Sequence, residues 1–456
     1  ASALYATAFA RHLLAAGHAQ PGDEILVGRD FRASSPAISA IAIAALRKAG
    51  LAPRDCGELP TPALALLGLA RKAACLMVTG SHIPADRNGI KFYRPDGEID
   101  KTDEAAITAA AEAIRAEGTV FDAARETAED LGATAMALYG ARNRQLLPDG
   151  SLAGLRVGVY QHSTVARDLF VSVLAHYGAD VVALGRSETF IPVDTEAVSP
   201  QTVALLQGWA AEHGLHAIIS ADGDGDRPLI TDETGTPIRG DLVGLIACRF
   251  LGASAIATPV TSNSGIEAAV GGAVLRTRVG SPYVIAAMNE AVAAGETAVA
   301  GFEANGGTLT TTPFPVNGHV LAPLPTRDSL MPVLAVLALA AAEKRPLSEI
   351  AAGFALPAAA SDRLENFPVE TSAALMAELR SGPGPLAAFL APIGVPQKTS
   401  DIDGLRVTLE DGSVVHFRPS GNAPEMRCYV EAADEAAAAR LLQAGLGRIR
   451  EWAASR

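Results

Sequence analysis

Short apolar runs alternate with longer amphipathic stretches through most of the chain, and this alternation predicts strands separated by helices. Three cycles of strand, helix, strand, helix and strand follow one another, with serine, threonine or proline near the expected helix starts. Successive βαβ units favour parallel strands, so we expect three similar α/β domains with mixed, mostly parallel sheets. The expected strands lie at 24–28, 74–78, 155–160, 179–184, 216–220, 253–260, 273–279 and 297–302, and the expected helices begin near Ser34 or Ser35, Thr61, Thr102, Ser163, Ser199, Ser264 and Ser281.

The C-terminal part of the sequence follows another pattern. Residues 404–418 are typical of a hairpin that turns at Asp411 and Gly412. A strand at 426–432 and a helix from about Asp434 follow, which together predict a separate α+β domain. The four predicted domains, arranged around a central cleft, are 1–150, 151–252, 253–362 and 363–456.

Composition narrows the class of protein. The 456 residues are 49% hydrophobic and 19% charged, which indicates a folded chain rather than a disordered one. A formal net charge of −13 argues against nucleic acid or an anionic membrane as the partner. The sequence shows no apolar run of about 18 residues and no signal peptide, and its four cysteines stand singly. We therefore expect a soluble cytoplasmic protein, while the oligomeric state stays open.

The stretch ADGDGDR places Asp222, Asp224 and Asp226 directly after an apolar strand. At about 5 Å and an effective dielectric near 20, each pair of these carboxylates repels by roughly 3 kcal/mol, so a cation is expected among them. Three carboxylates with room for further oxygen ligands suit Mg²⁺. A solvated acidic turn is one alternative. An EF-hand with Glu233 at its last position is another, but Arg227 stands where that loop needs glycine.

Three further polar loops follow strands in corresponding places, and ligands of open α/β sheets bind at such strand ends. The first, TGSHIPADRNGIK, contains Ser81, His82 and Lys91. It lacks a glycine two residues after the serine, which excludes a serine-hydrolase elbow. A phosphorylated Ser81 beside a metal ion would account for the acidic loop, because the cation would neutralise the carboxylates and activate a phosphoryl group.

The other two loops offer groups that bind phosphates and sugars. In RPSGNAPEMR, Arg418, the hydroxyl of Ser420 and the backbone around Gly421 have the components of a phosphate site. In FEANGG, Glu303 and Asn305 suit a pair of sugar hydroxyls. Each motif by itself is also compatible with an ordinary turn.

Together the four loops resemble those of the α-D-phosphohexomutase family, in the same order and over nearly the whole chain. The resemblance implies that Ser81 carries the phosphoryl group and that a phosphate oxygen of Ser81 joins the three aspartates as an Mg²⁺ ligand. It also implies that GRDFRASS (28–35) and VGSPY (279–283) contact the substrate's phosphate or sugar. The catalytic residues so implied are Ser81, His82, Lys91 and Arg227, the metal ligands are Ser81, Asp222, Asp224 and Asp226, and the substrate-binding residues are Arg32, Ser281, Glu303, Asn305, Arg418, Ser420, Gly421 and Asn422.

The implied reaction interconverts a hexose 1-phosphate and a hexose 6-phosphate through a hexose 1,6-bisphosphate. The pattern TGSHIP…FEANGG is similar to that of the bacterial phosphomannomutases, so we expect mannose as the sugar. Phosphoglucomutase or dual activity is the alternative, followed by a metal-dependent phosphatase and a non-catalytic sugar-phosphate binder. The family's glycine- and arginine-containing N-terminal segment is not in the sequence given, and we expect that it has been truncated. The other departures from the family pattern are Gly80, Ile83, Gly306, Gly307 and Asn422.

Overall fold

The computed structural model describes residues 1–119, 121, 124–421 and 424–455. The chain forms two compact units. The first comprises Ala1–Ala257 and Ser281–Gly353, and the second comprises Thr258–Gly280 and Phe354–Arg456. Within the described residues, every helix is too short or too polar to cross a membrane.

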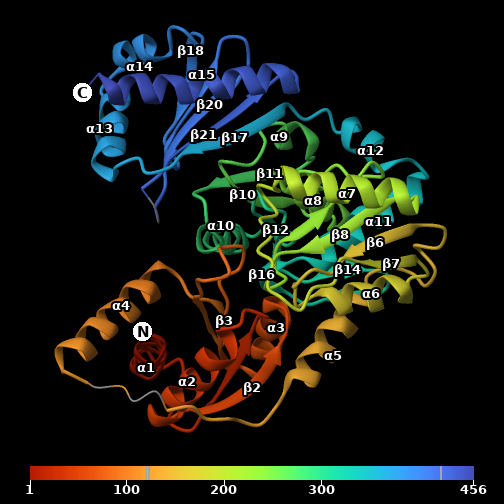
Figure 1. Cartoon of the computed structure of the whole chain (residues 1–456), viewed down its shortest axis with the longest axis vertical. Helices are drawn as coiled ribbons and strands as arrows, with labels where there is room; N and C mark the ends of the chain where they lie inside the picture. The colour runs from red at the N-terminus through yellow and green to blue at the C-terminus, as the bar shows by residue number, and fades with distance from the viewer. Residues whose placement is uncertain (120, 122–123, 422–423, 456) are drawn as a thin grey trace. The chain divides into compact units, whose positions relative to one another are not determined.

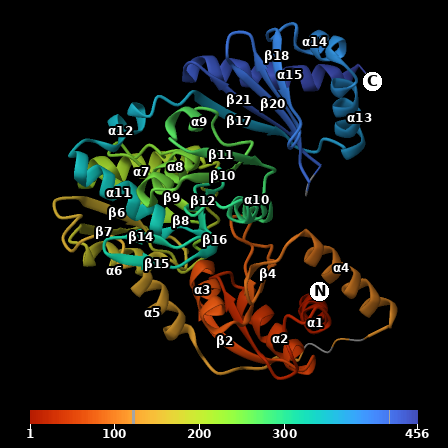
Figure 2. The same ribbon diagram turned by 180° about the vertical axis from the view of Figure 1, so that it is seen from behind.

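Three sheets of the first unit share one strand arrangement (Figures 1 and 2). In each, the first strand pairs in parallel with the third, and the third pairs antiparallel with the fourth. The neighbouring strands run β2-β1-β3-β4-β5, β7-β6-β8-β9 and β10-β12-β13-β16. Their bounds are β1 (Glu24–Arg29), β2 (Ala52–Glu58), β3 (Ala74–Val78), β4 (Ile90–Arg94), β5 (Gly97–Glu98), β6 (Arg156–Tyr160), β7 (Asp180–Leu184), β8 (Ala217–Ala221), β9 (Pro228–Ile230), β10 (Ala255–Pro259), β12 (Val299–Phe302), β13 (Thr308–Thr310) and β16 (Leu324–Asp328), with a separate hairpin of β14 (Phe314–Val316) and β15 (His319–Leu321).

Helices cover the first sheet on both faces. Ile25 and Val27 of β1 belong to a core cluster shared with α1, α2 and α4, whereas α3 packs on β1 and β3 together with α5. The alternation of side chains along a strand accounts for these two buried faces. The helices of the first unit are α1 (Ser2–Ala15), α2 (Ser35–Lys48), α3 (Thr61–Arg71), α4 (Lys101–Ala116), α5 (Gly132–Asn143), α6 (Arg167–His176), α7 (Pro200–His213), α8 (Gly240–Leu251), α10 (Ser281–Ala293), α11 (Leu330–Glu343) and α12 (Leu347–Gly353).

The second unit is built on a five-stranded antiparallel sheet of order β17-β21-β20-β19-β18. Helix α15 packs along this sheet, and α13 and α14 complete the core (Figure 1). The predicted hairpin at 404–418 is present as β19 and β20, which are joined through Asp411 and Gly412. The elements are α9 (Ile266–Ala269), β11 (Ala273–Thr277), β17 (Ala358–Leu364), α13 (Val369–Arg380), α14 (Pro383–Leu390), β18 (Pro396–Ser400), β19 (Leu405–Leu409), β20 (Val414–Pro419), β21 (Met426–Ala432) and α15 (Glu435–Ala454).

The predicted start of α2 is confirmed, although its cap differs, and the predicted starts of α6 and α9 were wrong in detail. Ser34 occupies the N-cap position of α2 but its side chain makes no capping bond, and the Ser35 hydroxyl donates to Asp30 instead. Helix α6 begins at Arg167, four residues after the predicted Ser163. Helix α9 has a single turn that begins at Ile266, and Ser264, which was predicted to begin it, binds the Glu431 carboxylate through its backbone N–H and its hydroxyl.

The predicted loops occupy equivalent places in the fold. Each loop of the first unit connects the third and fourth strands of its sheet, which are antiparallel. The residue pairs next to the three loops, in chain order, are Val78 with Ile90, Ala221 with Pro228, and Phe302 with Thr308. The loop of the second unit lies between β20 and β21 in the same way. The predicted fold class, three similar α/β domains and a C-terminal α+β domain, is confirmed, while the domain boundaries and the shared central cleft stay predictions.

Candidate active site

The acidic loop, residues 222–227, is a compact cluster of negative charge. Asp222, Asp224 and Asp226 are fully buried, and one carboxylate oxygen of each lies within 4.8 Å of the others. Asp222 Oδ1 accepts the backbone N–H groups of Asp226 and Arg227, both at 3.2 Å, which curls the loop. The Thr61 hydroxyl at the start of α3 donates to Asp224 Oδ2 at 2.5 Å. These bonds tie the acidic loop to the first sheet's helix layer.

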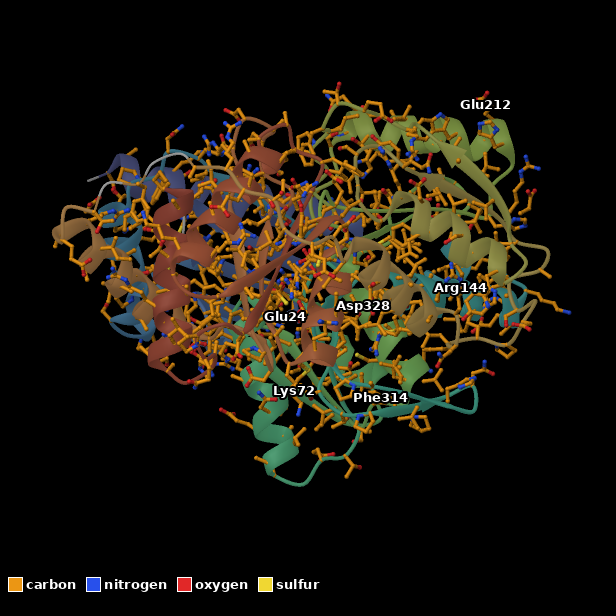
Figure 3. All side chains as sticks on the ribbon, turned by 90° about the horizontal axis from the view of Figure 1, so that it is seen from below. Glu24, Lys72, Arg144, Glu212, Phe314 and Asp328 are labelled. Carbon is orange, nitrogen blue, oxygen red and sulfur yellow. The ribbon has the colours of Figure 1, made fainter. Side chains whose placement is uncertain are left out.

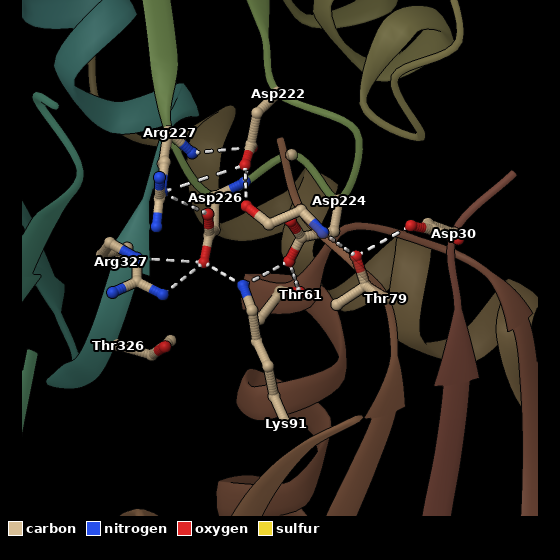
Figure 4. A network of polar contacts seen from close by, with 12 residues as sticks. Asp30, Thr61, Thr79, Lys91, Asp222, Asp224, Asp226, Arg227, Thr326 and Arg327 are labelled. Atoms are coloured by element: carbon tan, nitrogen blue, oxygen red, sulfur yellow. Dashed lines mark hydrogen bonds and ion pairs between the residues drawn. The ribbon is translucent and has the colours of Figure 1, made fainter. Parts of the chain in front are cut away.

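The hydroxyl of Ser81 lies on this acidic loop. Ser81 Oγ donates to Asp222 Oδ2 at 2.5 Å, although 141 positions separate the two residues. The serine backbone is left-handed, with φ of 51°, an uncommon conformation for a residue with a side chain. Its N–H donates to Thr79 Oγ1 at 2.8 Å, and Thr79 Oγ1 donates to Asp30 at 2.8 Å (Figure 4). The loop therefore presents the serine in one fixed orientation.

Arg32 holds the loop that carries Ser81. The Arg32 guanidinium is buried, and its Nε donates to Asp30 at 3.1 Å. A Cβ at Gly80 would lie 2.7 Å from Arg32 Cζ, which accounts for the glycine where the family pattern has alanine. We expected Arg32 to contact the substrate's phosphate, but the structure directs all its donors to protein groups, a geometry that supports a role in shaping the loop. The remaining donors bind the carbonyls of Ser81, Ile83, Pro84 and Arg87 at 2.6 to 2.8 Å.

Lys91 and Arg327 donate hydrogen bonds to carboxylates of the acidic loop. Lys91 Nζ donates to Asp224 and Asp226 at 2.5 and 2.6 Å. Arg327 Nε and Nη2 donate to Asp226 Oδ2 at 3.0 and 2.9 Å (Figure 4). Lys91 was predicted from the sequence but Arg327 was missed, because Arg327 lies within β16 rather than in a loop. The signal for it was a polar Thr-Arg-Asp end on an otherwise apolar strand.

His82 and Arg227 form a pair beside Ser81. Arg227 Nη1 donates to His82 Nδ1 at 2.9 Å, so this nitrogen is the acceptor and the proton of the neutral ring lies on Nε2. Ser81 Oγ is 3.4 Å from the same Nδ1. Burial lowers the pKa of His82, and the neighbouring Arg227 charge lowers it further. The imidazole at this position is therefore neutral at pH 7.

The protonation of the acidic loop is uneven. Burial, together with repulsion from Asp224 and Asp226, raises the pKa of Asp222 to about 8. Burial would also raise the pKa of Asp226, but Arg327 and Lys91 outweigh it and hold that pKa far below its usual range. Asp222 faces Arg227 at 3.9 Å between Nε and Oδ2, whereas Lys91 and Arg327 bind Asp226 directly, so positive charge compensates Asp226 more strongly than Asp222.

The acidic loop fits a hard divalent cation. Asp224 Oδ1 and Asp226 Oδ1 are buried and have no hydrogen-bond partner among the described residues. Unpaired carboxylate oxygens in the protein interior are costly, and oxygen is the ligand that Mg²⁺ prefers. These two oxygens, with Asp222 and the oxygen on Ser81, form a suitable donor set.

The sugar loop, residues 303–307, meets the acidic loop through Arg327. The buried Glu303 carboxylate accepts from Arg327 Nη1 at 2.6 Å. Asn305 Oδ1 accepts the Gly307 N–H at 3.0 Å, so this predicted sugar contact also shapes its own loop. Ser281, another predicted contact, donates from Oγ to Glu98 Oε2 at 2.5 Å.

The phosphate loop of the second unit, residues 418–427, is described in part. Arg418 Nε donates to Asp403 Oδ2 at 2.8 Å, and the same oxygen accepts the Val279 N–H at 3.0 Å. The Ser420 N–H donates to the Glu425 carbonyl at 2.9 Å, and Gly421 is exposed. The predicted contact Asn422 lies outside the described residues.

Family models match the chain in four successive segments. They describe phosphoglucomutase/phosphomannomutase alpha/beta/alpha domain I over 2–118, domain II over 143–235, domain III over 239–356 and the C-terminal domain over 363–445.

Curated relatives match over almost the full length. The chain is 56% identical to a phosphomannomutase of Sinorhizobium fredii over 98% of this chain and 94% of the relative. It is 41% identical to a phosphomannomutase of Salmonella muenchen over 92% and 86% of the two chains.

Solved structures share the fold. A phosphoglucomutase/phosphomannomutase family protein of Burkholderia thailandensis superposes with a TM-score of 0.76 at 23% identity, covering 99% of this chain and 93% of that one. The phosphoglucomutase parafusin of Paramecium, in its open form, gives a TM-score of 0.69 at 16% identity over 98% and 91% of the chains.

Proposed function

Since the chain belongs to the phosphoglucomutase/phosphomannomutase family and is a phosphohexomutase, we propose that it interconverts mannose 1-phosphate and mannose 6-phosphate through a phosphorylated Ser81. The observation that carries this proposal is the 2.5 Å bond between Ser81 Oγ and Asp222, which brings the serine onto a buried cluster of carboxylates. The preference for mannose is supported by the names of the relatives that are 56% and 41% identical. Glucose phosphate is the second candidate substrate.

We propose that Asp222, Asp224 and Asp226 hold Mg²⁺ together with a phosphate oxygen on Ser81. The bound ion would offset the negative charge of the phosphoryl group and so make it a better target for a hydroxyl. The buried oxygens Asp224 Oδ1 and Asp226 Oδ1, which accept no hydrogen bond from the described residues, support this assignment.

The reaction needs one exchange of bonds in each direction. The bond from phosphorus to Ser81 Oγ breaks as a bond from phosphorus to the sugar's free hydroxyl oxygen forms, and the hydroxyl proton ends on Ser81 Oγ. The resulting hexose 1,6-bisphosphate turns within the site, and the reverse exchange at its other phosphate restores phosphorylated Ser81. We assign the relay of that proton to neutral His82, whose Nδ1 lies 3.4 Å from the serine oxygen and accepts from Arg227.

The remaining predicted residues are assigned to stabilising the charge of the transferred phosphoryl group and to binding the sugar and its other phosphate. Lys91 lies against Asp224 and Asp226 and is assigned to the negative charge of the transferred group. Glu303 is assigned to the sugar's hydroxyls, with Asn305 and Ser281 supporting the surrounding loops. Arg418, Ser420, Gly421 and Asn422 are assigned to the phosphate that does not react.

The working environment proposed is the cytoplasm. All four cysteines are free and buried, as expected where thiols stay reduced. The partners proposed are phosphorylated hexoses, with neither nucleic acid nor membrane.

Intact-protein mass spectrometry tests the central step. We expect one phosphoryl group, located on Ser81 by fragmentation. Dephosphorylated enzyme should be inactive on mannose 1-phosphate until hexose 1,6-bisphosphate is added. Ser81→Ala should bind substrate without turnover.

Three outcomes would contradict the proposal. Release of free phosphate without an isomer would indicate a phosphatase, and binding without turnover by the wild-type protein would indicate a sugar-phosphate binder. Full activity in Ser81→Ala would remove the serine from the mechanism. Parallel assays on glucose 1-phosphate measure the sugar preference.

A further inference from the structure

Arg327 lies outside every loop that the sequence singles out, yet it connects two of them. It is the fourth residue of β16, and 9% of its side chain is exposed. It donates to Asp226 through Nε and Nη2, and to Glu303 through Nη1. One guanidinium thus binds both the Asp226 carboxylate of the acidic loop and the Glu303 carboxylate of the sugar loop, and so fixes their relative position.

The sugar loop is shaped to admit this arginine. A Cβ at Gly307 would lie 2.7 Å from Cγ and Cδ of Arg327, so a side chain at position 307 would push the guanidinium away. The Gly307 N–H is itself held by Asn305. Gly307 and Glu303 are therefore both fitted to Arg327, one by its lack of a side chain and the other by its charge.

We propose that Arg327 is a positioning residue with two effects: it orients Glu303 for the sugar, and its charge limits how tightly the acidic loop binds a divalent cation. This inference rests on the proposed function, in which Glu303 contacts the substrate and the acidic loop holds Mg²⁺. A carboxylate held by a charged hydrogen bond loses less freedom when substrate binds, which lowers KM. The positive charge of Arg327, which binds the Asp226 carboxylate, repels a metal cation that binds the same carboxylate.

The two effects predict changes of opposite sign in Arg327→Gln. The KM for mannose 1-phosphate should rise about tenfold, because Glu303 loses its charged hydrogen bond. The affinity for Mn²⁺ should increase about three- to tenfold, because the repulsion is removed. A residue that only maintained the fold would weaken both interactions when replaced.

The metal measurement is calorimetric titration of the dephosphorylated full chain with MnCl₂ and no sugar. A second variant, Arg327→Lys, keeps the charge but lacks the planar fork that reaches two carboxylates. We expect it to bind Mn²⁺ as the wild type does while its KM rises. Thermal unfolding of every variant reports whether the fold is intact.

Arg54→Gln is the matched control. Arg54 Nε also joins two carboxylates of the first unit, Glu24 at 3.0 Å and Glu129 at 3.6 Å, and Glu24 (labelled in Figure 3) begins β1 at the opposite end from the loops. Both KM and Mn²⁺ affinity should be unchanged in this variant. A change like that in Arg327→Gln would show that the effect is a general consequence of losing an arginine.

The outcomes separate this inference from the proposed function. An unchanged KM or a weaker Mn²⁺ affinity in a folded Arg327→Gln overturns the inference, even if the wild type is an active mutase. If Arg327→Gln does not fold, an unchanged KM in Arg327→Lys overturns it instead. Absence of turnover by the wild type overturns the proposed function, whereas tighter Mn²⁺ binding in Arg327→Gln still supports the charge effect.

Discussion

Among the described residues, two clusters of the first unit contain donors that could hold a metal ion, and they differ in what those donors already bind. The acidic loop keeps two buried carboxylate oxygens that accept no hydrogen bond from the described residues. The helix cluster, formed by His12, His18 and Asp103, has its candidate ligand atoms equally close together. However, Asp103 Oδ1 binds His12 at 2.8 Å, and Oδ2 binds Arg94 at 2.7 Å and the Asp100 N–H at 2.9 Å. Proximity of ligand types alone does not make a metal site; unused donor oxygens distinguish the acidic loop.

The largest expected effect is on catalysis. Asp224→Asn should lower kcat/KM roughly a thousandfold, because a neutral amide cannot offset a divalent charge as a carboxylate does. Mg²⁺ affinity should fall with it, while circular dichroism shows an intact fold. Wild-type rates with unchanged metal dependence would show that the acidic loop does not hold the ion.

Metal addition should act on the acidic loop alone. Mg²⁺ at a hundred times its Kd should stabilise the folded protein by about 2.7 kcal/mol, seen as a rise in Tm that chelation reverses. Asp224→Asn should lose this rise, and His12→Gln should keep it. Loss of the rise in His12→Gln would assign the ion to the helix cluster.

Removing the helix cluster's carboxylate should affect stability rather than activity. Asp103→Ala breaks the link between α1 and α4 and removes the capping box at the start of α4, at a cost of about 2 kcal/mol. Urea unfolding measures the loss, and the kcat and Mg²⁺ affinity serve as the control. A lower kcat at full folding would connect α4 to the chemistry.

The smallest effect concerns His416, a buried histidine of the second unit. Burial, and next the Arg406 charge, lower the pKa of His416 to about 4. Its Nε2 binds the Asp403 carbonyl at 2.6 Å, and Arg418 also lies nearby. The unfolded histidine binds protons below about pH 6.5, so stability is lost as pH falls from 6.5 towards 4, by about 1 kcal/mol at pH 5.5. His416→Gln should flatten this dependence in urea unfolding, and an unchanged slope would refute the assignment.

The sequence predicted the parts of this molecule that local pattern determines. Apolar runs ended where β3, β8 and β12 end, and charge density in the acidic loop predicted a partner for it. The meeting of Ser81 with Asp222 followed from the rule that ligands gather at strand ends, and the structure places them 2.5 Å apart.

What the sequence could not predict depends on contacts between distant residues. Arg32 was expected at a phosphate, but its donors reach backbone carbonyls more than forty positions away. Arg327 carries no motif, because its two carboxylate partners come from different loops. Tyr139 of α5 donates to Asp328, labelled in Figure 3, at 2.5 Å across 189 positions, a pairing that no local pattern contains.

The shared hairpin position of the three loops has a consequence for engineering substrate range. Each loop joins two antiparallel strands, and the strand residues on either side of the loop pair with each other. Within the sugar loop, Glu303 and Gly307 are fitted to Arg327, and Asn305 holds the Gly307 N–H. A library built on this scaffold should therefore randomise position 304 and keep positions 303, 305 and 307 constant.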